Sequence, residues 1–318
     1  MSDTHPIRIG ISHCLLGAEV RFDGGHKRDS FLADTLSQHV QWVPVCPEVE
    51  AGFGTPREAM RLVGPSDEPG LVTIRTGRDL TPEMHRFSHR RLRELSAQNL
   101  SGFVFKKDSP SCGIERVRLY SSHGIPGRQG IGLFARSFMQ RFPLIPVEEE
   151  GRLNDPVLRE NFLERVFCYH RWQDATRKGF ARRTIVQFHT EHKYLLLAHS
   201  QPHFQELGRM VGQASRYSPT QLAQQYGARF MEALKVKATV RKHVNVLEHI
   251  LGHFTERLTG AERGELHGTI RDYHRGLTPL VVPLTLVKHY VRRFDIAYMR
   301  SQVYLNPHPK ELMLRNHV

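Results

Sequence analysis

The sequence contains few of the features that mark exported or membrane proteins. Four cysteines in 318 residues, none of them in a close pair, are too few for a disulfide scaffold, so we expect a reducing cytoplasm. The longest apolar run, at residues 280–287, contains a proline and falls short of the roughly 20 residues that cross a bilayer. The N-terminus lacks a basic segment followed by a long apolar stretch and a cleavage site, so nothing predicts export or a membrane.

Positive charge is distributed unevenly along the chain. Residues 1–150 contain 19 basic and 18 acidic side chains, for a net charge of +1, whereas residues 151–318 contain 26 and 14, for a net charge of +12. Thirteen of the 20 histidines also lie in the second half, so we expect its charge to rise on mild acidification. This asymmetry predicts a nearly neutral unit joined to one that binds a polyanion; the alternative is a basic surface without a partner.

The first half alternates short apolar runs with helical patterns, which is typical of an α/β domain with a mostly parallel sheet. Helical patterns cover residues 29–39, 82–98 and 131–141, and Thr81 is the expected N-cap of the second. The expected strands cover residues 7–12, 42–45, 71–75, 102–105, 117–120 and 144–147.

The pattern changes after residue 150, where strand-like runs give way to long amphipathic patterns. Helix starts are expected at Ser218-Pro219 and Thr278-Pro279, and the first helix is expected over residues 154–178. The sequence therefore predicts an α/β domain over residues 1–150 and a basic all-α domain over residues 151–318.

Three cysteines follow expected strands of the first domain. Cys14 comes after the strand at residues 7–12, Cys46 after the strand at 42–45, and Cys112 a few residues after the strand at 102–105. Because the loops after the carboxyl ends of parallel strands converge on one crevice, the three thiols can meet in space. Three soft ligands suit an iron-sulfur cluster or zinc, but their spacing alone leaves open that they are small buried hydrophobic residues.

Five short motifs surround these cysteines. They are SHCLLG at residues 12–17, VRFDGGHK at 20–27, VCPE at 45–48, GFGTPR at 52–57 and KDSPSCG at 107–113. Together and in this order they resemble the thiouracil desulfidase family across essentially the whole first domain. His13 is a departure, because that position is often small in the family.

The resemblance implies a [4Fe-4S] cluster held by Cys14, Cys46 and Cys112, with the fourth iron free to take the sulfur of a thiolated uracil. It also implies that Glu48 is the catalytic acid and that Ser109 is the family's serine. Three thiolates leave one iron as an open Lewis acid, and a soft thiocarbonyl sulfur matches it.

Attack by water needs a base for the water proton and an acid for the ring nitrogen, and Glu48, two residues after a ligand, is expected to lie close to the reacting carbon. Ser109 is expected to hydrogen-bond the pyrimidine or pass a proton. Without the resemblance, Glu48 is better interpreted as a solvated carboxylate or helix cap, and Ser109 as the start of a turn. Asp23 and Lys27 are expected to contact substrate or orient their loop. Lys107 is expected to meet a phosphate, although such a lysine is more often plain surface.

The basic half contains clustered cations that are expected to contact nucleic-acid phosphates without reading bases. Its aromatic residues Phe180, Phe188 and Tyr194 suit base stacking, but a core role is favoured. The histidine pair at 249/253 has the spacing of a metal pair but lacks the glutamate of a zinc-protease helix, so packing or surface roles are favoured for it and for the pair at 189/192. Cys168 lies in mid-helix, where a structural thiol is favoured. The predicted nucleic-acid contacts are Arg182, Arg183, Lys237, Arg241 and Lys242.

The second half is similar to the basic domain that accompanies this module in longer bacterial proteins, which are implicated in desulfurating 4-thiouridine in tRNA. The leading hypothesis is therefore a cytoplasmic tRNA 4-thiouridine desulfidase that releases hydrosulfide by hydrolysis. No nicotinamide or flavin cofactor is expected, because the glycines at residues 130–132 are too few for a dinucleotide fingerprint. The alternatives are a desulfidase of free thiouracil or thiolated nucleotides, a redox or sulfur-transfer protein, and a non-catalytic nucleic-acid-binding protein with structural zinc.

Overall fold

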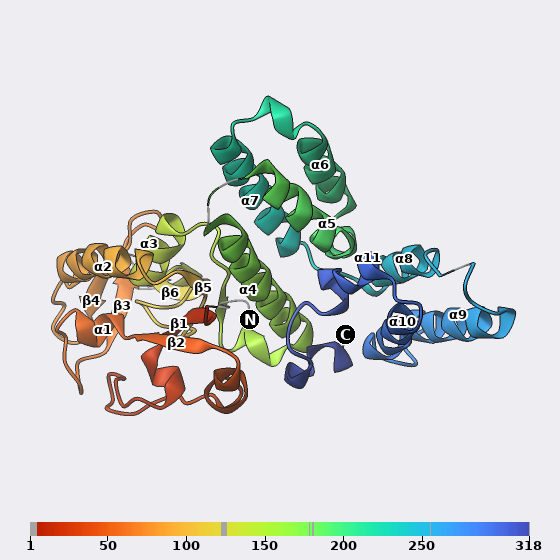
Figure 1. Cartoon of the computed structure of the whole chain (residues 1–318). Helices are drawn as coiled ribbons and strands as arrows, with labels where there is room; N and C mark the ends of the chain where they lie inside the picture. The colour runs from red at the N-terminus through yellow and green to blue at the C-terminus, as the bar shows by residue number, and fades with distance from the viewer. Residues whose placement is uncertain (1–4, 122–125, 178, 180, 255, 318) are drawn as a thin grey trace. The chain divides into compact units, whose positions relative to one another are not determined.

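The structure of the chain, a computed structural model, describes residues 5–121, 126–177, 179, 181–254 and 256–317. It divides into two units, Met1–Asp155 and Pro156–Val318. The first unit is α/β with a mostly parallel sheet and the second is all helical, so the predicted fold class is confirmed (Figure 1). The division lies a few residues beyond the expected position near residue 150.

A four-stranded parallel sheet forms the centre of the first unit. Its spatial order is β2 (Gln41–Val45), β1 (Arg8–Ser12), β5 (Leu100–Phe105) and β8 (Val147–Glu149). Every residue of β5 is buried, as expected for a central parallel strand that is covered on both faces. The carboxyl ends of the four strands therefore lie at one edge of this sheet.

A second, mixed sheet contains two of the strands that were expected in the parallel one. Its order is β4 (Gly70–Thr73), β3 (Met60–Val63), β6 (Val117–Tyr120) and β7 (Pro126–Gly130), with antiparallel pairs at both ends. The sequence prediction missed β3 and β7. Strand β7 has the sequence PGRQG, which has low intrinsic β propensity, so its pairing with β6 makes it a strand.

Three local predictions in this unit were wrong in detail. Residues 29–39 form a π-helical turn at Phe31–Thr35 and a 3-10 turn at Leu36–Gln38 instead of one α-helix. Helix α2 (Thr81–Ser96) begins at Thr81, whose hydroxyl accepts a hydrogen bond from the Leu71 amide and does not cap the helix. The strand expected at 144–147 begins only at its last residue, since Pro143 and Pro146 lack amide donors.

Aromatic side chains fill the core between the parallel sheet and the helices. Phe103 on β5 contacts Phe138 on α3 (Leu133–Arg141), with ring centroids 4.8 Å apart. A Cβ atom on Gly10 would lie 2.2 Å from the Phe103 ring, so only glycine at this position of β1 allows the ring to pack there. This close packing holds β1 and β5 together directly behind the strand ends that carry the cysteines.

The second unit is a set of helices in two groups (Figure 1). Helices α5, α6 and α7 pack on one another, as do α8, α9 and α10, and α5 also contacts α8. The predicted start at Ser218-Pro219 is confirmed by a capping box, whereas the helix expected at Thr278-Pro279 begins at Val281. The helices are α4 (Pro156–Arg177), α5 (Arg182–His199), α6 (Gln201–Gly212), α7 (Pro219–Lys235), α8 (Val240–Leu251), α9 (Gly260–His274), α10 (Val281–Arg293) and α11 (Ala297–Arg300).

The C-terminal segment is anchored in this unit by a buried arginine. The Arg315 guanidinium donates to Glu160 Oε1 at 3.0 Å and to the Tyr304 carbonyl at 2.6 Å. Glu164, beside Glu160 on α4, is 2.7 Å from His199 Nε2. Because buried charges are costly unless they are paired, this network ties the end of the chain to α4 and α5.

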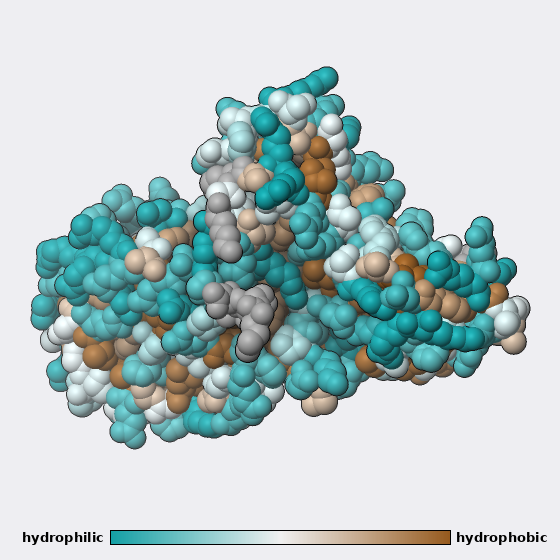
Figure 2. Space-filling model, viewed as in Figure 1, coloured by the Kyte–Doolittle hydropathy of each residue, from teal (hydrophilic) through white to brown (hydrophobic). Residues whose placement is uncertain are grey.

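The face of the molecule drawn in Figure 2 is mostly hydrophilic, and its apolar side chains occur singly or in small groups. Among the described residues, no helix has the length and apolar character required to span a membrane.

Several histidines of the second unit are buried, so they do not contribute to the expected rise in its charge on mild acidification. His192 stacks on Phe188, and its Nδ1 lies 2.7 Å from the Phe188 carbonyl. Burial lowers the pKa of His192 and of His243 to about 3, and that of His189 and of His308 to about 4. These four imidazoles stay neutral in the folded unit at pH 6, so they add no positive charge to it at that pH.

We predict that acid destabilises the second unit through these histidines. In the unfolded chain a histidine has a pKa of about 6.5, so between pH 6.5 and 3 the unfolded state binds more protons and the free energy of unfolding falls as the pH is lowered. The expected loss is about 2 kcal/mol per fully buried histidine between pH 7 and pH 5. Urea denaturation of the wild type and of His192→Phe at both pH values measures it. A loss that is equal in the two proteins would contradict the prediction.

Candidate functional site

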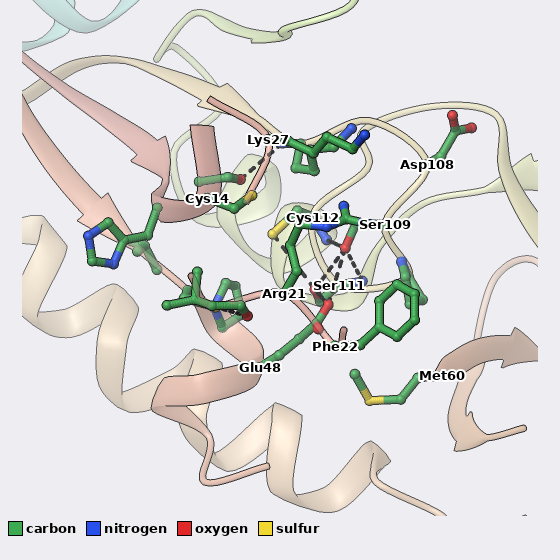
Figure 3. Close-up of a pocket in the computed structure, with 18 of the residues that line it drawn as sticks. Cys14, Arg21, Phe22, Lys27, Glu48, Met60, Asp108, Ser109, Ser111 and Cys112 are labelled. Carbon is green, nitrogen blue, oxygen red and sulfur yellow. Dashed lines mark hydrogen bonds between the residues drawn. The ribbon is translucent and has the colours of Figure 1, made fainter. Parts of the chain in front are cut away.

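The three cysteines that follow β1, β2 and β5 line one pocket at the carboxyl edge of the parallel sheet. The pocket has a volume of about 330 Å³. Figure 3 shows Cys14 and Cys112 on one side of it, with Glu48, Ser109 and Ser111 linked by hydrogen bonds. Cys46 lies 32 positions after Cys14 and 66 positions before Cys112. Parallel strand pairing brings the three to one cavity, as predicted.

Short turns that begin at the strand ends position the first two cysteines. Cys14 lies in a 3-10 turn, His13–Leu16, and its carbonyl accepts hydrogen bonds from the Gly17 amide at 3.3 Å and the Lys27 amide at 3.0 Å. Cys46 is the N-cap of α1 (Pro47–Glu50), and its amide donates to Glu50 Oε1 at 2.8 Å. The backbone of each cysteine is therefore fixed by bonds within its own loop.

The loop that carries Cys112 is held by the start of helix α3. The amides of Phe134 and Ala135 both donate to the Ser111 carbonyl at 3.1 Å. A Cβ atom on Gly132 would lie 2.5 Å from the Ser111 carbonyl carbon, so glycine allows this close approach of loop and helix. The first free amides of α3 thus bind a loop carbonyl, which places Cys112 at the pocket.

All four cysteines are free thiols, and the three in the pocket are mostly buried. Burial raises the pKa of Cys14 to about 11, against the opposing effect of Lys106, and it also raises the pKa of Cys46 and of Cys112. In the described part of the chain, no set of three His, Cys, Asp or Glu side chains is close enough to hold a single metal ion.

Glu48 is held by a buried arginine. The Arg57 Nε donates to Glu48 Oε2 at 3.0 Å, and its Nη2 forms a second, shorter bond to the same oxygen. The Arg57 Nη1 also donates to the carbonyls of Val20 and Gly54, at 3.0 and 2.9 Å. Only 6% of the Arg57 side chain and 13% of the Glu48 side chain are exposed, so the pair fixes the direction of the carboxylate in a largely dry site.

Two serine hydroxyls donate hydrogen bonds to the other oxygen of the Glu48 carboxylate. The Ser111 hydroxyl donates to Glu48 Oε1 at 2.6 Å and the Ser109 hydroxyl at 3.3 Å, while the two hydroxyls lie 3.0 Å apart. Ser109 Oγ also accepts from the Cys112 amide at 3.1 Å, and Ser111 Oγ lies 3.7 Å from Cys112 Sγ. A connected set of polar groups therefore joins the expected acid to one of the expected ligands.

The sequence prediction gave no role to Arg57 or Ser111, although both residues contact Glu48. Arg57 is the last residue of the GFGTPR motif and Ser111 lies inside KDSPSCG. The signal was therefore present in these motifs, but the hydrogen-bond partners depend on how the loops fold together.

Two of the three residues predicted to bind substrate line the pocket, and the third does not. Lys27 and Lys107 line the pocket, as does His13. Asp23 is not among the described residues that line it: its carboxylate accepts hydrogen bonds from the Gly25 amide at 3.1 Å and from Arg21 at 3.3 Å. The bond from Gly25 lowers the pKa of Asp23. Asp23 therefore orients its own loop.

The five cations predicted to bind nucleic acid differ in their surroundings. Arg182 donates to the carbonyls of Ala214 and Tyr217, and the Lys242 ammonium donates to those of His199 and Lys237, so these two side chains stabilise chain turns. The other three are exposed, and within the described residues their side chains form no ion pair or hydrogen bond. They are Arg183, Lys237 and Arg241.

The sequence analysis also weighed base stacking or metal binding against packing for aromatic, cysteine and histidine side chains of the second unit. Those described below are buried in the core or bind another side chain. Phe188 and Tyr194 are 4% and 3% exposed, so the preference for packing over base stacking is confirmed, whereas Phe180 lies outside the described residues. Cys168 is fully buried in α4, and His253 Nε2 lies 2.7 Å from the Tyr194 hydroxyl.

Comparisons with known proteins match both units. The family described as 2-thiouracil desulfurase matches residues 9–150, and the family described as a protein of unknown function, DUF1722, matches residues 193–309. The chain is 32% identical to the uncharacterized protein YbgA of Escherichia coli, over 49% of this chain and 94% of that protein. It is 31% identical to the uncharacterized protein YbbK of Bacillus subtilis, over 33% of this chain and 72% of that protein.

The chain belongs to the 2-thiouracil desulfurase family. A solved structure, the [4Fe-4S]-dependent thiouracil desulfidase TudS, is 31% identical in sequence, with 47% of this chain and 94% of that chain covered and a TM-score of 0.38. The assignment rests on sequence, because the TM-score is too low for the similarity of shape to add to it. Membership of the 2-thiouracil desulfurase family supports a desulfidase role for this chain.

We predict that Ser111→Ala lowers the kcat of desulfuration about 10-fold or more, because it removes the shorter of the two hydroxyl bonds that orient Glu48. Steady-state sulfide release from a thiolated uracil measures the effect. Ser137→Ala is the matched control, since among the described residues the Ser137 hydroxyl bonds only to the Leu133 carbonyl within α3. Equal rates for the two variants would show that Ser111 has no part in the reaction.

Proposed function

We propose that the chain is a cytoplasmic desulfidase that hydrolyses 4-thiouridine in tRNA to uridine and releases hydrosulfide. The observation that carries this proposal is the single pocket lined by Cys14, Cys46 and Cys112 together with an oriented carboxylate. Family membership supports the type of reaction. The basic second unit supports a polymeric substrate.

The donor set of the pocket fits a [4Fe-4S] cluster. Three thiols come from three different strand ends, and cysteine sulfur is the usual ligand of such clusters. In a cubane each cysteine binds a different iron, so its ligands need not be as close together as those of a single zinc ion. The related thiouracil desulfidase TudS is described as [4Fe-4S]-dependent. When bound by these three cysteines, the cluster supplies a Lewis-acidic iron without a protein ligand, to which a thiocarbonyl sulfur can bind.

The chain's own residues orient and move protons around the reacting carbon. The reaction adds water to the thiolated carbon and expels its sulfur as hydrosulfide, so one group must accept a proton from water. Glu48 is suited to this role because Arg57 and two serines fix its carboxylate beside the cysteines. Ser109 and Ser111 lie 3.0 Å apart and both reach Glu48 Oε1, so they can pass that proton along their hydroxyls.

The charge of the second unit supports tRNA over a free base as substrate. Residues 151–318 have a net charge of +12, and Arg183, Lys237 and Arg241 are exposed cations without a partner among the described residues. Cations of this kind contact phosphates irrespective of base sequence, so recognition of the thiolated base would be left to the cysteine pocket.

The zinc alternative is not favoured by the arrangement of the donors. A structural zinc ion is bound tetrahedrally by four side chains that lie within one coordination sphere. In the described part of the chain no three such donors are close enough to share one ion. A desulfidase of free thiouracil or of thiolated nucleotides would use the same pocket, and the substrate comparison below separates it from the tRNA enzyme.

We predict that Cys14→Ala, Cys46→Ala and Cys112→Ala each lose the cluster, seen as loss of iron, of the brown colour and of activity after anaerobic reconstitution. Cys168→Ala is the matched control, since this thiol is buried in α4 of the other unit, and it should keep both iron and activity. Glu48→Gln should keep the iron but lower kcat about 100-fold or more. Full activity of any of the three pocket variants would refute the mechanism.

We also predict a preference for the polymer. The kcat/KM on 4-thiouridine-containing tRNA should exceed that on the 4-thiouridine nucleoside by about 10-fold or more at low salt, and it should fall steeply as salt is raised. The triple variant Arg183→Gln, Lys237→Gln, Arg241→Gln should lose this advantage while keeping the rate on the nucleoside. If the wild type prefers the free base or nucleoside at every salt concentration, the enzyme acts on small molecules.

A further inference from the structure

A second cavity borders the cysteine pocket and has no role in the reaction described above. Its volume is about 300 Å³. It shares Met60, Asp108 and Pro110 with the cysteine pocket, so the two cavities adjoin each other. Most of its remaining lining lies on β3, β6 and β7 of the mixed sheet, and of these three strands the sequence prediction included β6 alone.

Three arginines from three neighbouring strands of that sheet line this cavity: Arg61 on β3, Arg118 on β6 and Arg128 on β7. The Arg61 guanidinium lies over the Tyr120 ring, 4.9 Å from its centroid, and its buried Nε has no hydrogen-bond partner. Within the described residues, none of the three side chains forms an ion pair or a hydrogen bond. By contrast, Arg57 in the neighbouring pocket is fully paired.

Three guanidinium groups that form no ion pair within the described residues provide the donors for binding a phosphate. Guanidinium forks match phosphate oxygens with two parallel hydrogen bonds, and three of them exceed the charge of the one acid that lines the cavity, Asp108. Phe22 and Met60 line the cysteine pocket beside this wall (Figure 3), and 42% of Phe22 is exposed, although large apolar side chains are usually buried. An aromatic face next to a cationic cavity is the surface that a base followed by a phosphate requires.

We propose that the cavity formed by Arg61, Arg118 and Arg128 binds the phosphate of the nucleotide whose base enters the cysteine pocket. The inference rests on the proposed function and narrows its substrate to uracil bases that carry a sugar phosphate. The phosphate has two possible sources, the 5′-phosphate of a free nucleotide or the phosphodiester of an RNA chain.

Binding of the reaction product tests the site without depending on turnover. Isothermal titration of the full-length protein with uridine 5′-monophosphate should give an affinity about 10-fold or more above that for uridine, because charge-assisted bonds to phosphate are present only in the former. Arg118→Gln with Arg128→Gln should remove this difference and leave uridine binding unchanged. Arg86→Gln with Arg93→Gln is the matched control, since it removes two exposed arginines of α2 from the same unit.

A second variant is expected to raise the affinity for the nucleotide instead of lowering it. Asp108→Asn removes the carboxylate from the cavity and should raise the affinity for uridine 5′-monophosphate several-fold. Asparagine tolerates the left-handed backbone of this position, whose φ is 58°, so the loop is expected to keep its conformation.

The outcomes separate this inference from the proposed function. Equal affinity for nucleotide and nucleoside, or equal effects of the two double variants, would overturn the phosphate site. Arginine-dependent nucleotide binding in a protein that releases no sulfide from thiouracil, 4-thiouridine or thiolated tRNA would uphold the site and refute the reaction. A uridine-containing RNA oligonucleotide that binds through the same arginines more tightly than the monophosphate identifies RNA as the source; tighter binding of the monophosphate identifies the free nucleotide.

Discussion

The parallel pairing of β2, β1 and β5 is the constraint on which the whole site depends. Ser12 pairs with Val45 and Ile11 with Val104, so the three strands end at the same edge of the sheet. Each strand is followed by a turn that carries one cysteine. Because side chains alternate between the two faces of a sheet, even a one-residue slip in this register would move a cysteine away from the pocket. The close packing of Gly10 against Phe103 stabilises this register between β1 and β5.

The two adjoining cavities differ in whether their charged side chains are paired. In the cysteine pocket, Arg57 and Glu48 neutralise each other, and two serines complete the bonds of the carboxylate. This pairing offsets the cost of burying both ions and leaves the carboxylate in one orientation. In the second cavity, three arginines have no ion-pair or hydrogen-bond partner among the described residues, although Arg61 lies over the Tyr120 ring. A pocket with a fixed internal base beside a wall of unpaired cations suits a neutral ring that is attached to an anion.

The two units contribute different properties to the proposed enzyme. The first contains the donor atoms and the oriented carboxylate, while the second contributes most of the positive charge. That charge counts only lysine and arginine against aspartate and glutamate, with every histidine neutral. Attraction to a polyanion therefore does not require acid conditions.

The sequence alone was sufficient for the fold class, the main parallel strands and the three cysteines at their ends. The apolar run at residues 102–105 was enough to predict a strand from local pattern, although β5 begins two residues earlier. The motifs around Cys14, Cys46 and Cys112 identified the family. Local pattern could not identify β7, whose sequence PGRQG becomes a strand only by pairing with β6, and it could not place Thr81, whose hydroxyl binds a distant amide.

For the functional side chains too, some features were predicted from the sequence and others were not. Glu48 was predicted from the family resemblance, but its partners Arg57 and Ser111 were not, because these contacts join residues 9 and 63 positions apart. Asp23 was expected to contact substrate or orient its loop, and its hydrogen bonds show the second role. Arg182 and Lys242, which were expected to contact nucleic acid, bind carbonyls of the chain. The sequence thus determined which chemical groups are present and roughly where the strands end. Only the tertiary structure decided which groups meet, because hydrogen bonds and buried charges depend on distances in space that residue spacing along the chain does not contain.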